Sequence, residues 1–283
     1  MIPDFVRYNV GMERRHHGHA HHHVAMSYPV SLPARIYGLF LGPLCVVALI
    51  ALATYFYPLL APSGVPISFD TILLAAAATC ARLLVAYVLA VVVAVPLSLF
   101  VVSNPLIELI FLPVFDVLES VPILVLFPVL VVLFVSSGYL NGAAIAILFL
   151  TMLWSIVFTL VGGLKIIPKD ILYAGQVFGL NGFSLIRRVM LPAVVPQFVT
   201  GSILALAQGW NIIIVAEVLH TYIPGGTSAQ DLFGIGAILV QASANAQTGV
   251  FIASVFVMVV IIAFFNFVVW QRLLHYSQKF RFE

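Results

Sequence analysis

Long apolar segments that carry almost no charge are the feature that most restricts how this chain can fold. A helix needs about 20 apolar residues to cross the hydrocarbon core of a bilayer. Six segments are candidates for such spans: 36–57, 72–102, 122–135, 142–164, 196–219 and 249–270. The third is short, so we expect it to begin before Pro122, and the second is long enough to tilt or protrude. The pattern predicts an all-α polytopic membrane protein with about six transmembrane helices.

The composition agrees with a membrane protein and disfavours the soluble classes. Apolar residues make up 63% of the 283 residues and charged residues 8%, whereas soluble domains are about 45–50% apolar and about 25% charged. So few charges do not cover a soluble surface, which argues against a soluble enzyme. The net charge of +2 gives no basic footprint, so no nucleic-acid partner is expected. Cys45 and Cys80 lie in apolar runs without metal-ligand spacing and are expected to be free thiols.

The distribution of Lys and Arg predicts how the spans are oriented. With six spans, every Lys and Arg except Arg82 falls on one face of the membrane. These residues are Arg7, Arg14, Arg15, Arg35, Lys165, Lys169, Arg187, Arg188, Arg272, Lys279 and Arg281. The positive-inside rule places that face in the cytoplasm. We therefore expect a multi-pass protein of the cell (inner, cytoplasmic) membrane with both termini and the loop 165–195 in the cytoplasm.

The loop 165–195 is the one sizeable polar insertion between two spans, the fourth and the fifth. Its sequence predicts two short helices, 171–178 and 183–190, separated by a turn at 179–182, with Pro192 ending the second helix. Such a compact helical pair suits docking into a groove of a partner protein. The same composition also allows an amphipathic connector that lies on the lipid surface. The residues alone leave both readings open.

One pattern in this loop resembles a known family. Tyr173-Ala174-Gly175, three residues, Gly179, nine residues and then Val189-Met190-Leu191-Pro192 is similar to the EAA loop of ATP-binding-cassette importer permeases. That pattern is Glu-Ala-Ala, three residues, Gly, nine residues, an aliphatic residue, any residue and Leu-Pro. Tyr173 stands in place of the Glu and Gly175 in place of the second Ala. A salt bridge that the family Glu would make with the ATPase is therefore in doubt.

The resemblance extends over roughly residues 68–283 and points to the nitrate/sulfonate/taurine-type anion permease group. The further matching segments are 79–82 with 96–99, 120–122 with 127–128, 209–211 with 215–217, and 266–283. On this reading the chain divides into a His-rich cytoplasmic N-terminal tail (1–34), a first span and outer loop (35–67), a permease domain (68–272) and a cytoplasmic C-terminal tail (273–283).

The resemblance implies the membrane-spanning permease subunit of an ATP-driven importer. Its partners would be cytoplasmic ATP-binding subunits, an extracytoplasmic solute-binding protein, a second permease copy (the same chain or a sister subunit) and the lipid bilayer. The solute would be a small anion such as nitrate, a sulfonate, taurine or bicarbonate. The chain lacks a GxxxxGK[ST] loop, so we expect no catalytic residue and no bound cofactor here, with ATP and Mg held by the ATPase. The predicted ATPase-coupling residues are Tyr173, Ala174, Gly175, Gly179, Arg187, Arg188, Leu191 and Pro192.

Ionisable residues in membrane spans are costly and by default face the interior of the bundle. Arg82, Glu108, Asp116, Glu119 and Glu217 are the candidates, and Arg82 is expected to pair with one of the acids. Structural pairing and an interfacial position are the alternatives to a role in the solute pathway. The predicted pathway or buried polar residues are Arg82, Asp116, Glu119, Trp210, Asn211 and Glu217.

Glycines suggest two further features. Gly201, Ala205 and Gly209 recur at every fourth residue, which predicts a face for close helix packing. Glycines at 225–226, 234 and 236 suggest a flexible segment at 222–247, either a contact or gate for the binding protein or a plain surface loop. No metal site is expected, although a His tract is a weak candidate: His16, His17, His19, His21, His22 and His23. A solvated tail is the alternative for that tract.

Two other classes of function compete with an importer permease. An ATP-independent secondary transporter or channel would be favoured by an inverted repeat or by interrupted helices around a midplane charge, neither of which is clear. It would also leave the loop 165–195 unexplained. An intramembrane enzyme would need a motif such as HExxH or GxSxG, and both are absent from the sequence.

Overall fold

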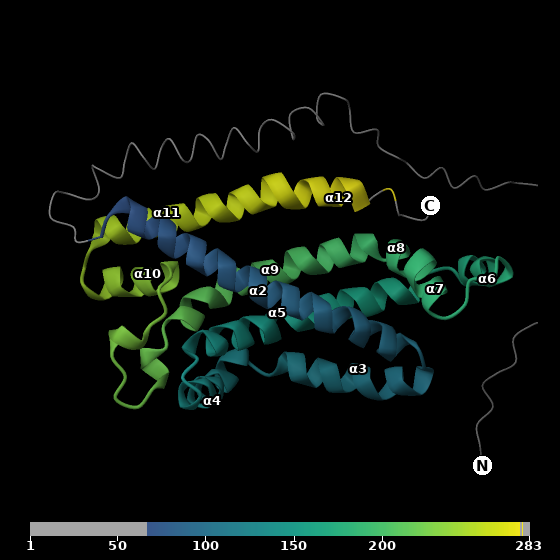
Figure 1. Cartoon of the computed structure of the whole chain (residues 1–283), viewed down its shortest axis with the longest axis horizontal. Coiled ribbons are helices and arrows are strands. Elements are labelled where there is room, and N and C mark those ends of the chain that lie inside the picture. The colour runs from purple at the N-terminus through teal and green to yellow at the C-terminus, as the bar shows by residue number, and fades with distance from the viewer. Residues whose placement is uncertain (1–66, 278, 280–283) are drawn as a thin grey trace, which may run out of the picture. The chain divides into compact units, whose positions relative to one another are not determined.

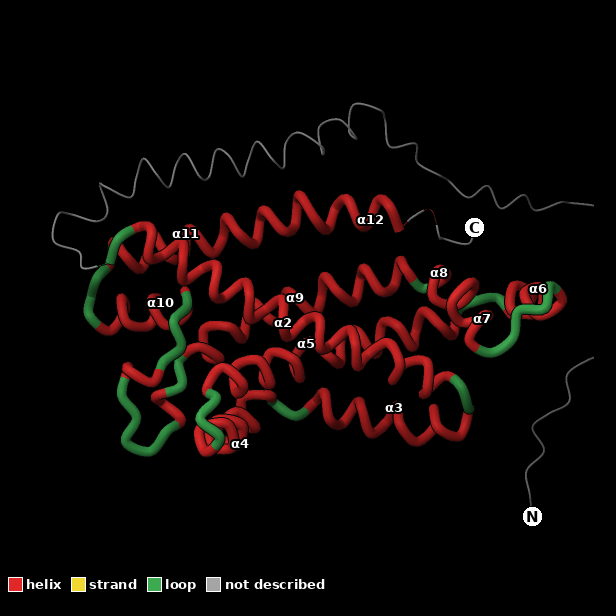
Figure 2. The backbone as a smooth tube through the Cα atoms, viewed as in Figure 1, coloured by secondary structure: helices red, strands yellow, loops and turns green. Residues whose placement is uncertain are grey.

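Helices make up all the regular secondary structure in the described part of the chain, residues 67–277 and 279 of the computed structural model (Figures 1 and 2). These residues belong to one compact unit, Leu39–Glu283. The principal helices are α2 (Phe69–Val102), α3 (Pro105–Ser120), α4 (Ile123–Ser136), α5 (Leu140–Lys165), α6 (Lys169–Val177), α9 (Val195–Glu217), α10 (Ile235–Ala244), α11 (Thr248–Phe264) and α12 (Gln271–Ser277). The predicted all-α class is confirmed.

Four stretches of helix in the described residues are long and apolar enough to cross a membrane. They are α2, α5, α9 and the continuous run Thr248–Ser277, which joins α11 to α12 through the π-helical turn η4 (Phe265–Trp270). They correspond to the predicted second, fourth, fifth and sixth spans. The pair α3–α4 would make a fifth span if counted as one. The predicted first span, at 36–57, lies outside the described residues, so the total of six spans stays a prediction.

The predicted third span is broken. Helices α3 and α4 meet at an angle of 84° across the link Val121–Pro122. Proline disfavours the helical conformation of the residue before it, and Val121 is extended, with φ −69° and ψ 121°. The start of α3 is also determined by the local sequence. The side chain of Asn104 accepts a hydrogen bond from the amide of Leu106 at 2.9 Å, and Pro105 occupies the first turn. In place of the single expected span that begins before Pro122, the chain therefore has two apolar helices that meet at a sharp bend.

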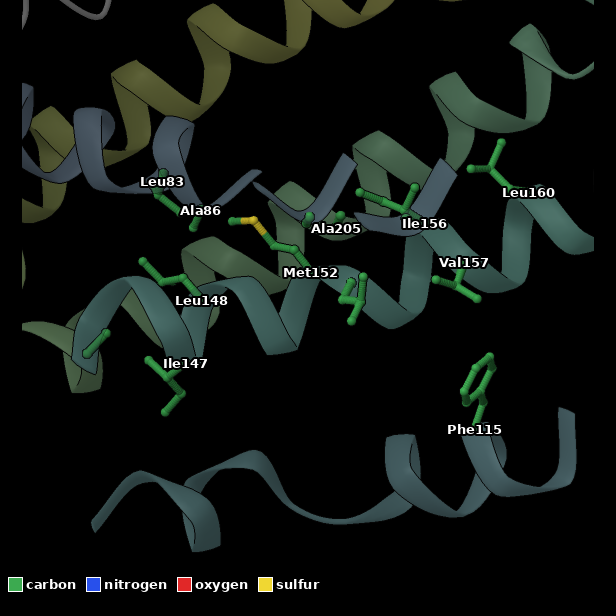
Figure 3. Close-up of a cluster of buried hydrophobic side chains, with 14 of the residues drawn as sticks. Leu83, Ala86, Phe115, Ile147, Leu148, Met152, Ile156, Val157, Leu160 and Ala205 are labelled. Carbon is green, nitrogen blue, oxygen red and sulfur yellow. The ribbon is translucent and has the colours of Figure 1, made fainter. Parts of the chain in front are cut away.

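Small residues on α2 allow α5 to pack closely against it. Ala86, Ala90 and Ala94 recur at every fourth position and are fully buried in the main core. Figure 3 shows Ala86 of α2 near Met152 of α5, within the largest cluster of buried apolar side chains. Close approach of backbones through small side chains is the usual way that membrane helices gain packing energy.

The expected small-residue face of α9 also serves packing within the chain. The buried residues of α9 include Gly201, Ala205 and Gly209, which face its neighbouring helices. A Cβ at Gly209 would collide with the end of Met152 and lie 2.8 Å from Cδ2 of Leu83. The α2, α5 and α9 helices therefore form one tightly packed group, which Tyr87 of α2 strengthens by donating a 2.7 Å hydrogen bond to Ser202 of α9.

The predicted two short helices of the loop 165–195 are present, and the second run of helix ends at Ala193, directly after Pro192. The chain passes from α7 (Phe183–Leu185) through the π-helical turn η1 (Ile186–Met190) into α8 (Leu191–Ala193) and then α9. A proline removes one helical amide, and here the amide of Leu191 bonds to the carbonyl of Ile186, five residues back. The wider turn carries the helix one residue past Pro192, and Val194 is a turn residue before α9 begins. The predicted helix end at Pro192 is therefore correct to within one residue.

Candidate functional site

Two regions carry the residues singled out from the sequence, and they lie at opposite ends of the long helices. Figure 1 shows α6 at one end of α5 and α9, and α10 at the other end. We call these the α6 end and the α10 end.

The α6 end is built around a rigid glycine turn. Gly179 has a φ of +78°, the left-handed region that favours glycine. The amide of Gly179 donates to the carbonyl of Gln176 at 2.9 Å, and the amide of Leu180 donates to the carbonyl of Gly175 at 3.0 Å. These two bonds form a Schellman motif, which satisfies the last carbonyls of α6 and reverses the chain.

Gly175, which stands where the family has its second Ala, lets α6 lie against the next short helix. Gly175 is buried, and a Cβ there would lie 2.8 Å from Cδ1 of Leu185 and 3.5 Å from Cγ2 of Val189. The glycine therefore permits a closer crossing than alanine would without a shift of Leu185. The result is a compact pair of helices held by side chains of the loop itself.

Four large apolar side chains of this pair point away from the core. Tyr173 is 59% exposed, Val177 85%, Phe178 84% and Phe183 75%. We call these four residues the α6 surface. The other predicted coupling residues lie beside it: Ala174, Gly179, Arg187 and Arg188 are exposed, while Leu191 and Pro192 are half-buried at the base of the loop. Contiguous exposed apolar side chains on a rigid support are typical of a protein or membrane contact.

At the α10 end the structure brings together two of the predicted polar residues, Arg82 of α2 and Glu217 of α9. The guanidinium donates from Nη1 to Oε1 of Glu217 at 2.6 Å. The side chain of Glu217 is 0% exposed and that of Arg82 is 11% exposed. Water therefore contributes little to solvating this pair, and the protein must provide its hydrogen bonds.

The protein does provide them, from four helices and one connection. Glu217 also accepts from the hydroxyl of Thr79 (2.7 Å) and from the amide of Gly236 (2.7 Å). Thr79 in turn accepts from the amide of Ile235 at 3.0 Å. The remaining donors of Arg82 reach the side-chain oxygen of Asn141 in α5 at 2.9 Å and the carbonyl of Phe233 at 2.8 Å. These residues form what we call the Glu217 cluster: Thr79, Arg82, Asn141, Glu217, Phe233, Ile235 and Gly236.

The Gly-Ile-Gly segment at the start of α10 serves this cluster by close packing. A Cβ at Gly234 would overlap the carboxylate of Glu217, and a Cβ at Gly236 would lie 2.7 Å from Cα of Ile214. The reading of these two glycines as points of flexibility is wrong, because the buried carboxylate occupies the space where their side chains would be. The sequence identified these two glycines, but it did not predict that Glu217 packs against them.

Residues 218–234, which we call the 218–234 connection, are tied down at several points. The amide of Leu232 donates to the carbonyl of Glu217 at 2.9 Å. His220 and Asp231 face each other, with Nδ1 of the imidazole 2.8 Å from Oδ1 of the carboxylate. Tyr222 stacks edge-on against Phe127 of α4, with ring centroids 4.8 Å apart. The connection therefore joins α4 to the group of helices that carries the Glu217 cluster.

The remaining predicted polar residues are not brought together. Glu108 at the start of α3 pairs with Lys165 at the end of α5, near the α6 end. Asp116 and Glu119 are exposed on α3, and no ion pair involves them within residues 67–277 and 279. Trp210 is packed against the core, whereas Asn211 is exposed on α9.

Metal-binding side chains do not gather in the described part of the chain. No group of three or more His, Cys, Asp or Glu residues suitable for a metal ion occurs in it. Cys80 is a free, partly buried thiol. The six histidines of the N-terminal tract and Cys45 lie outside the described residues.

The helical order and the loop between α5 and α9 agree with a recognised protein family. The model of the binding-protein-dependent transport system inner membrane component matches residues 86–275, well over half of the chain. The chain belongs to this family of transport permeases. The family and the apolar helices together make it a multi-pass protein of the inner membrane.

Curated relatives of this permease are named as permease proteins for several different solutes. The nitrate import permease protein NrtB of Leptolyngbya laminosa is 30% identical over 161 residues, which cover 57% of each chain. The bicarbonate transport system permease protein CmpB of a Synechocystis strain is 28% identical over 148 residues, 52% of each chain. The glycine betaine/proline betaine permease ProW of Escherichia coli is 25% identical over 62% of this chain and 48% of its own length. The chain thus spans about half the length of the curated relatives it matches.

A solved structure supports the fold. The inward-facing MetNI methionine ABC transporter contains a chain that aligns with a TM-score of 0.60 at 18% identity. The alignment covers 75% of this permease and 99% of that chain. This permease therefore shares its helix arrangement with that chain.

Proposed function

We propose that this chain is the membrane-spanning permease subunit of an ATP-driven importer, and that its α6 surface docks into a groove of a separate ATP-binding subunit. The observation that carries the proposal is the α6 surface itself. Its four large apolar side chains stand on a capped helical pair between two membrane-spanning helices. A rigid helix with an exposed apolar face is the usual form of a groove-binding contact.

Docking accounts for the shape of the loop better than a position on lipid does. An amphipathic helix in the interface needs only one continuous apolar face. Here the chain is instead folded back on itself at Gly179, with Gly175 buried against Leu185. With Tyr173 in place of the family Glu, contact with the ATPase rests mainly on apolar area.

The ATP and Mg of the transport cycle belong, on this proposal, to the partner. The permease converts closure of the ATPase into motion of its helices, which requires contacts that differ between the two states. The α6 end and both chain termini lie in the cytoplasm, and the α10 end meets an extracytoplasmic solute-binding protein. The excess of Lys and Arg at the α6 end supports this orientation.

The solute pathway lies between this chain and a second permease copy. Asp116 and Glu119 of α3 and Asn211 of α9 are polar, exposed and carried by helices of apolar composition. Facing them toward hydrocarbon would be costly, so they face the second copy or the pathway. Large exposed apolar side chains on α3 and its neighbour α4 supply the area for such a contact.

A small anion is the first solute class to test, because two of the relatives are named for nitrate and bicarbonate. Arg82, the cation of α2, is already neutralised by Glu217. The pathway proposed here offers an anion no free cation within residues 67–277, so selectivity belongs to the binding protein.

Site-directed cross-linking tests the docking contact. We expect Val177→Cys to cross-link to the co-expressed ATPase subunit with a short bifunctional thiol reagent, because this side chain is 85% exposed on the α6 surface. Val125→Cys on α4 is the matched control, being an exposed valine remote from the α6 surface. Absence of any ATPase adduct at position 177 in a complex that transports without ATP would favour a secondary transporter or channel instead.

A further inference from the structure

The Glu217 cluster has a feature that packing alone does not require, since an ion pair has been buried where apolar side chains would suffice. Replacing a buried ion pair by well-packed apolar residues is often neutral or stabilising, whereas removing one partner is strongly destabilising. Stability alone therefore does not explain the pair, whereas the high cost of separating its two partners does favour keeping them together. Each part comes from a different element, with Arg82 on α2 and Glu217 at the end of α9.

Separation of α10 from α2 and α9 would break several hydrogen bonds at once and leave their donors and acceptors without partners. The amide of Gly236 would leave Oε2 of Glu217, and the amide of Ile235 would leave the hydroxyl of Thr79. Arg82 would lose the carbonyl of Phe233. In a site that excludes water, each lost bond leaves an unsatisfied polar group, and the carboxylate is the costliest of them.

The cluster also reaches α4, the short helix beyond the 84° bend. Its link is the 218–234 connection, which begins at Glu217 and ends at the glycine packed on the same carboxylate. Within that connection, Tyr222 packs on Phe127 of α4 and Asp231 holds His220. A shift of α2 or α9 is thus passed to α10 and to α4 through contacts on both sides of Glu217.

We propose that Arg82 and Glu217 are positioning residues for transport, whose ion pair makes α10 and the 218–234 connection move as one body with α2, α5 and α9. This inference rests on the proposed importer function and deepens it. A displacement of the helices caused by the ATPase at the α6 end then moves the α10 end by the same rigid-body motion. Docking of the binding protein at the α10 end likewise displaces the α6 end.

The test measures the distance between two spin labels on one permease chain in the permease–ATPase complex. Labelled chains are diluted with unlabelled chains so that distances between two permease copies do not contribute. Spin labels at Leu84→Cys on α2 and Ser243→Cys on α10 occupy exposed positions on the two elements that the cluster joins. In the unsubstituted background we expect the same narrow distance distribution without nucleotide and with ATP plus vanadate. A distance that changes between those two states would overturn the inference, because the two elements would not form one body.

Substitutions at the pair give the second arm. In Arg82→Met or Glu217→Gln alone, we expect the distribution to broaden or to differ between the two states. Basal ATP hydrolysis should persist, while ATP-driven transport should fall about tenfold, since each single variant leaves one buried partner uncompensated. Arg82→Met with Glu217→Gln should recover the narrow distribution and most of the transport, because Gln can still accept from Gly236 and donate to Thr79.

Two further variants keep the outcome decisive. Should a single charge variant fail to fold, Thr79→Val removes the hydroxyl bridge to Ile235 while leaving the ion pair, and Thr79→Ser should behave as the parent. Glu108→Gln is the control, since its pair with Lys165 lies near the α6 end. Normal transport and an unchanged distance distribution in Glu217→Gln would overturn the inference. If Glu217→Gln does not fold, the same two results in Thr79→Val would overturn it. Failure of the parent chain to associate with any ATPase would instead overturn the proposed function.

Discussion

Gly234 lies directly against the carboxylate of Glu217, so closely that a Cβ at position 234 would overlap the carboxyl carbon and both oxygens. The carboxylate is completely buried and bound to Thr79, Arg82 and Gly236. The carboxylate therefore cannot move aside without breaking one of these bonds. This contact fixes the place where the 218–234 connection turns into α10.

Gly234→Ala should consequently be destabilising even though its backbone, at φ −173°, is extended and open to any residue. The added methyl must displace a carboxylate held by three partners, and over-packing of this kind typically costs about 1–3 kcal/mol. We expect a lower midpoint of thermal unfolding in detergent. Gly162→Ala is the control, because no atom lies within 4 Å of a Cβ at that helical position. Equal midpoints for the two variants would contradict the packing described here.

Gly179 tests the rigidity of the loop that bears the α6 surface. Any residue other than glycine must adopt φ +78° there, although no neighbouring atom would be touched. The left-handed conformation costs a non-glycine residue roughly 1–2 kcal/mol, with Asn among the exceptions. We expect Gly179→Val to insert normally but to lose solute-stimulated ATP hydrolysis, and Gly179→Asn to retain most of it. The measurement is the stimulated rate relative to the basal rate; coupled turnover at the normal ratio in Gly179→Val would contradict the docking assignment.

The Glu108–Lys165 pair should contribute far less than the buried pair. Its lysine is about half exposed, and exposed ion pairs are worth about 0.2–1 kcal/mol and are screened by salt. We expect Glu108→Gln to lower the unfolding midpoint slightly at low ionic strength and not at high ionic strength. A large, salt-independent loss would mean that the pair is effectively buried.

Gly209 tests the close approach of α9 to α2 and α5. Gly209→Ala meets the ends of two flexible side chains, Met152 and Leu83, and both must shift, so we expect a loss of about 1 kcal/mol. Gly209→Leu adds three further carbons to the same contact, more than shifts of Met152 and Leu83 can accommodate, and should prevent a stable fold. Gly209→Ala combined with Met152→Ala should cost less than the sum of the two single losses, because the obstructing methyl of Met152 is gone. Strictly additive losses would indicate that another neighbour sets the cost.

Much of the fold follows from hydropathy alone, because membrane spans are long and their charges few. The helices α2, α5 and α9 were predicted to within a few residues, and α4 matches the predicted segment 122–135, whereas the break before it was not predicted. The 84° angle between α3 and α4 could not be predicted, since it depends on how α4 packs on α5 and on Tyr222. The π-helical turn at 186–190 was not predicted, because such a turn leaves no recognisable sequence signal.

The candidate site divides in the same way. The costs of burying Arg82 and Glu217 could be deduced from the sequence, but their pairing depends on the contact of α2 with α9 over a separation of 135 residues. Thr79 gave a usable signal, being one helical turn before Arg82 on the same face. Asn141 gave none, because an isolated Asn at the start of a span reads as an interfacial residue. Gly234 and Gly236 were misread because their meaning lies in the residue packed against them.

The most direct measurement of the central claim is ATP hydrolysis by the purified complex in nanodiscs, with and without a solute-loaded binding protein. The subunits to be co-purified are this permease, its candidate ATPase and the binding protein. The account predicts stable association with the ATPase and a rate that the loaded binding protein stimulates through the α6 surface, so that removing the apolar side chains of Val177 and Phe178 abolishes the stimulation. Solute uptake that proceeds without any associated ATPase would contradict it.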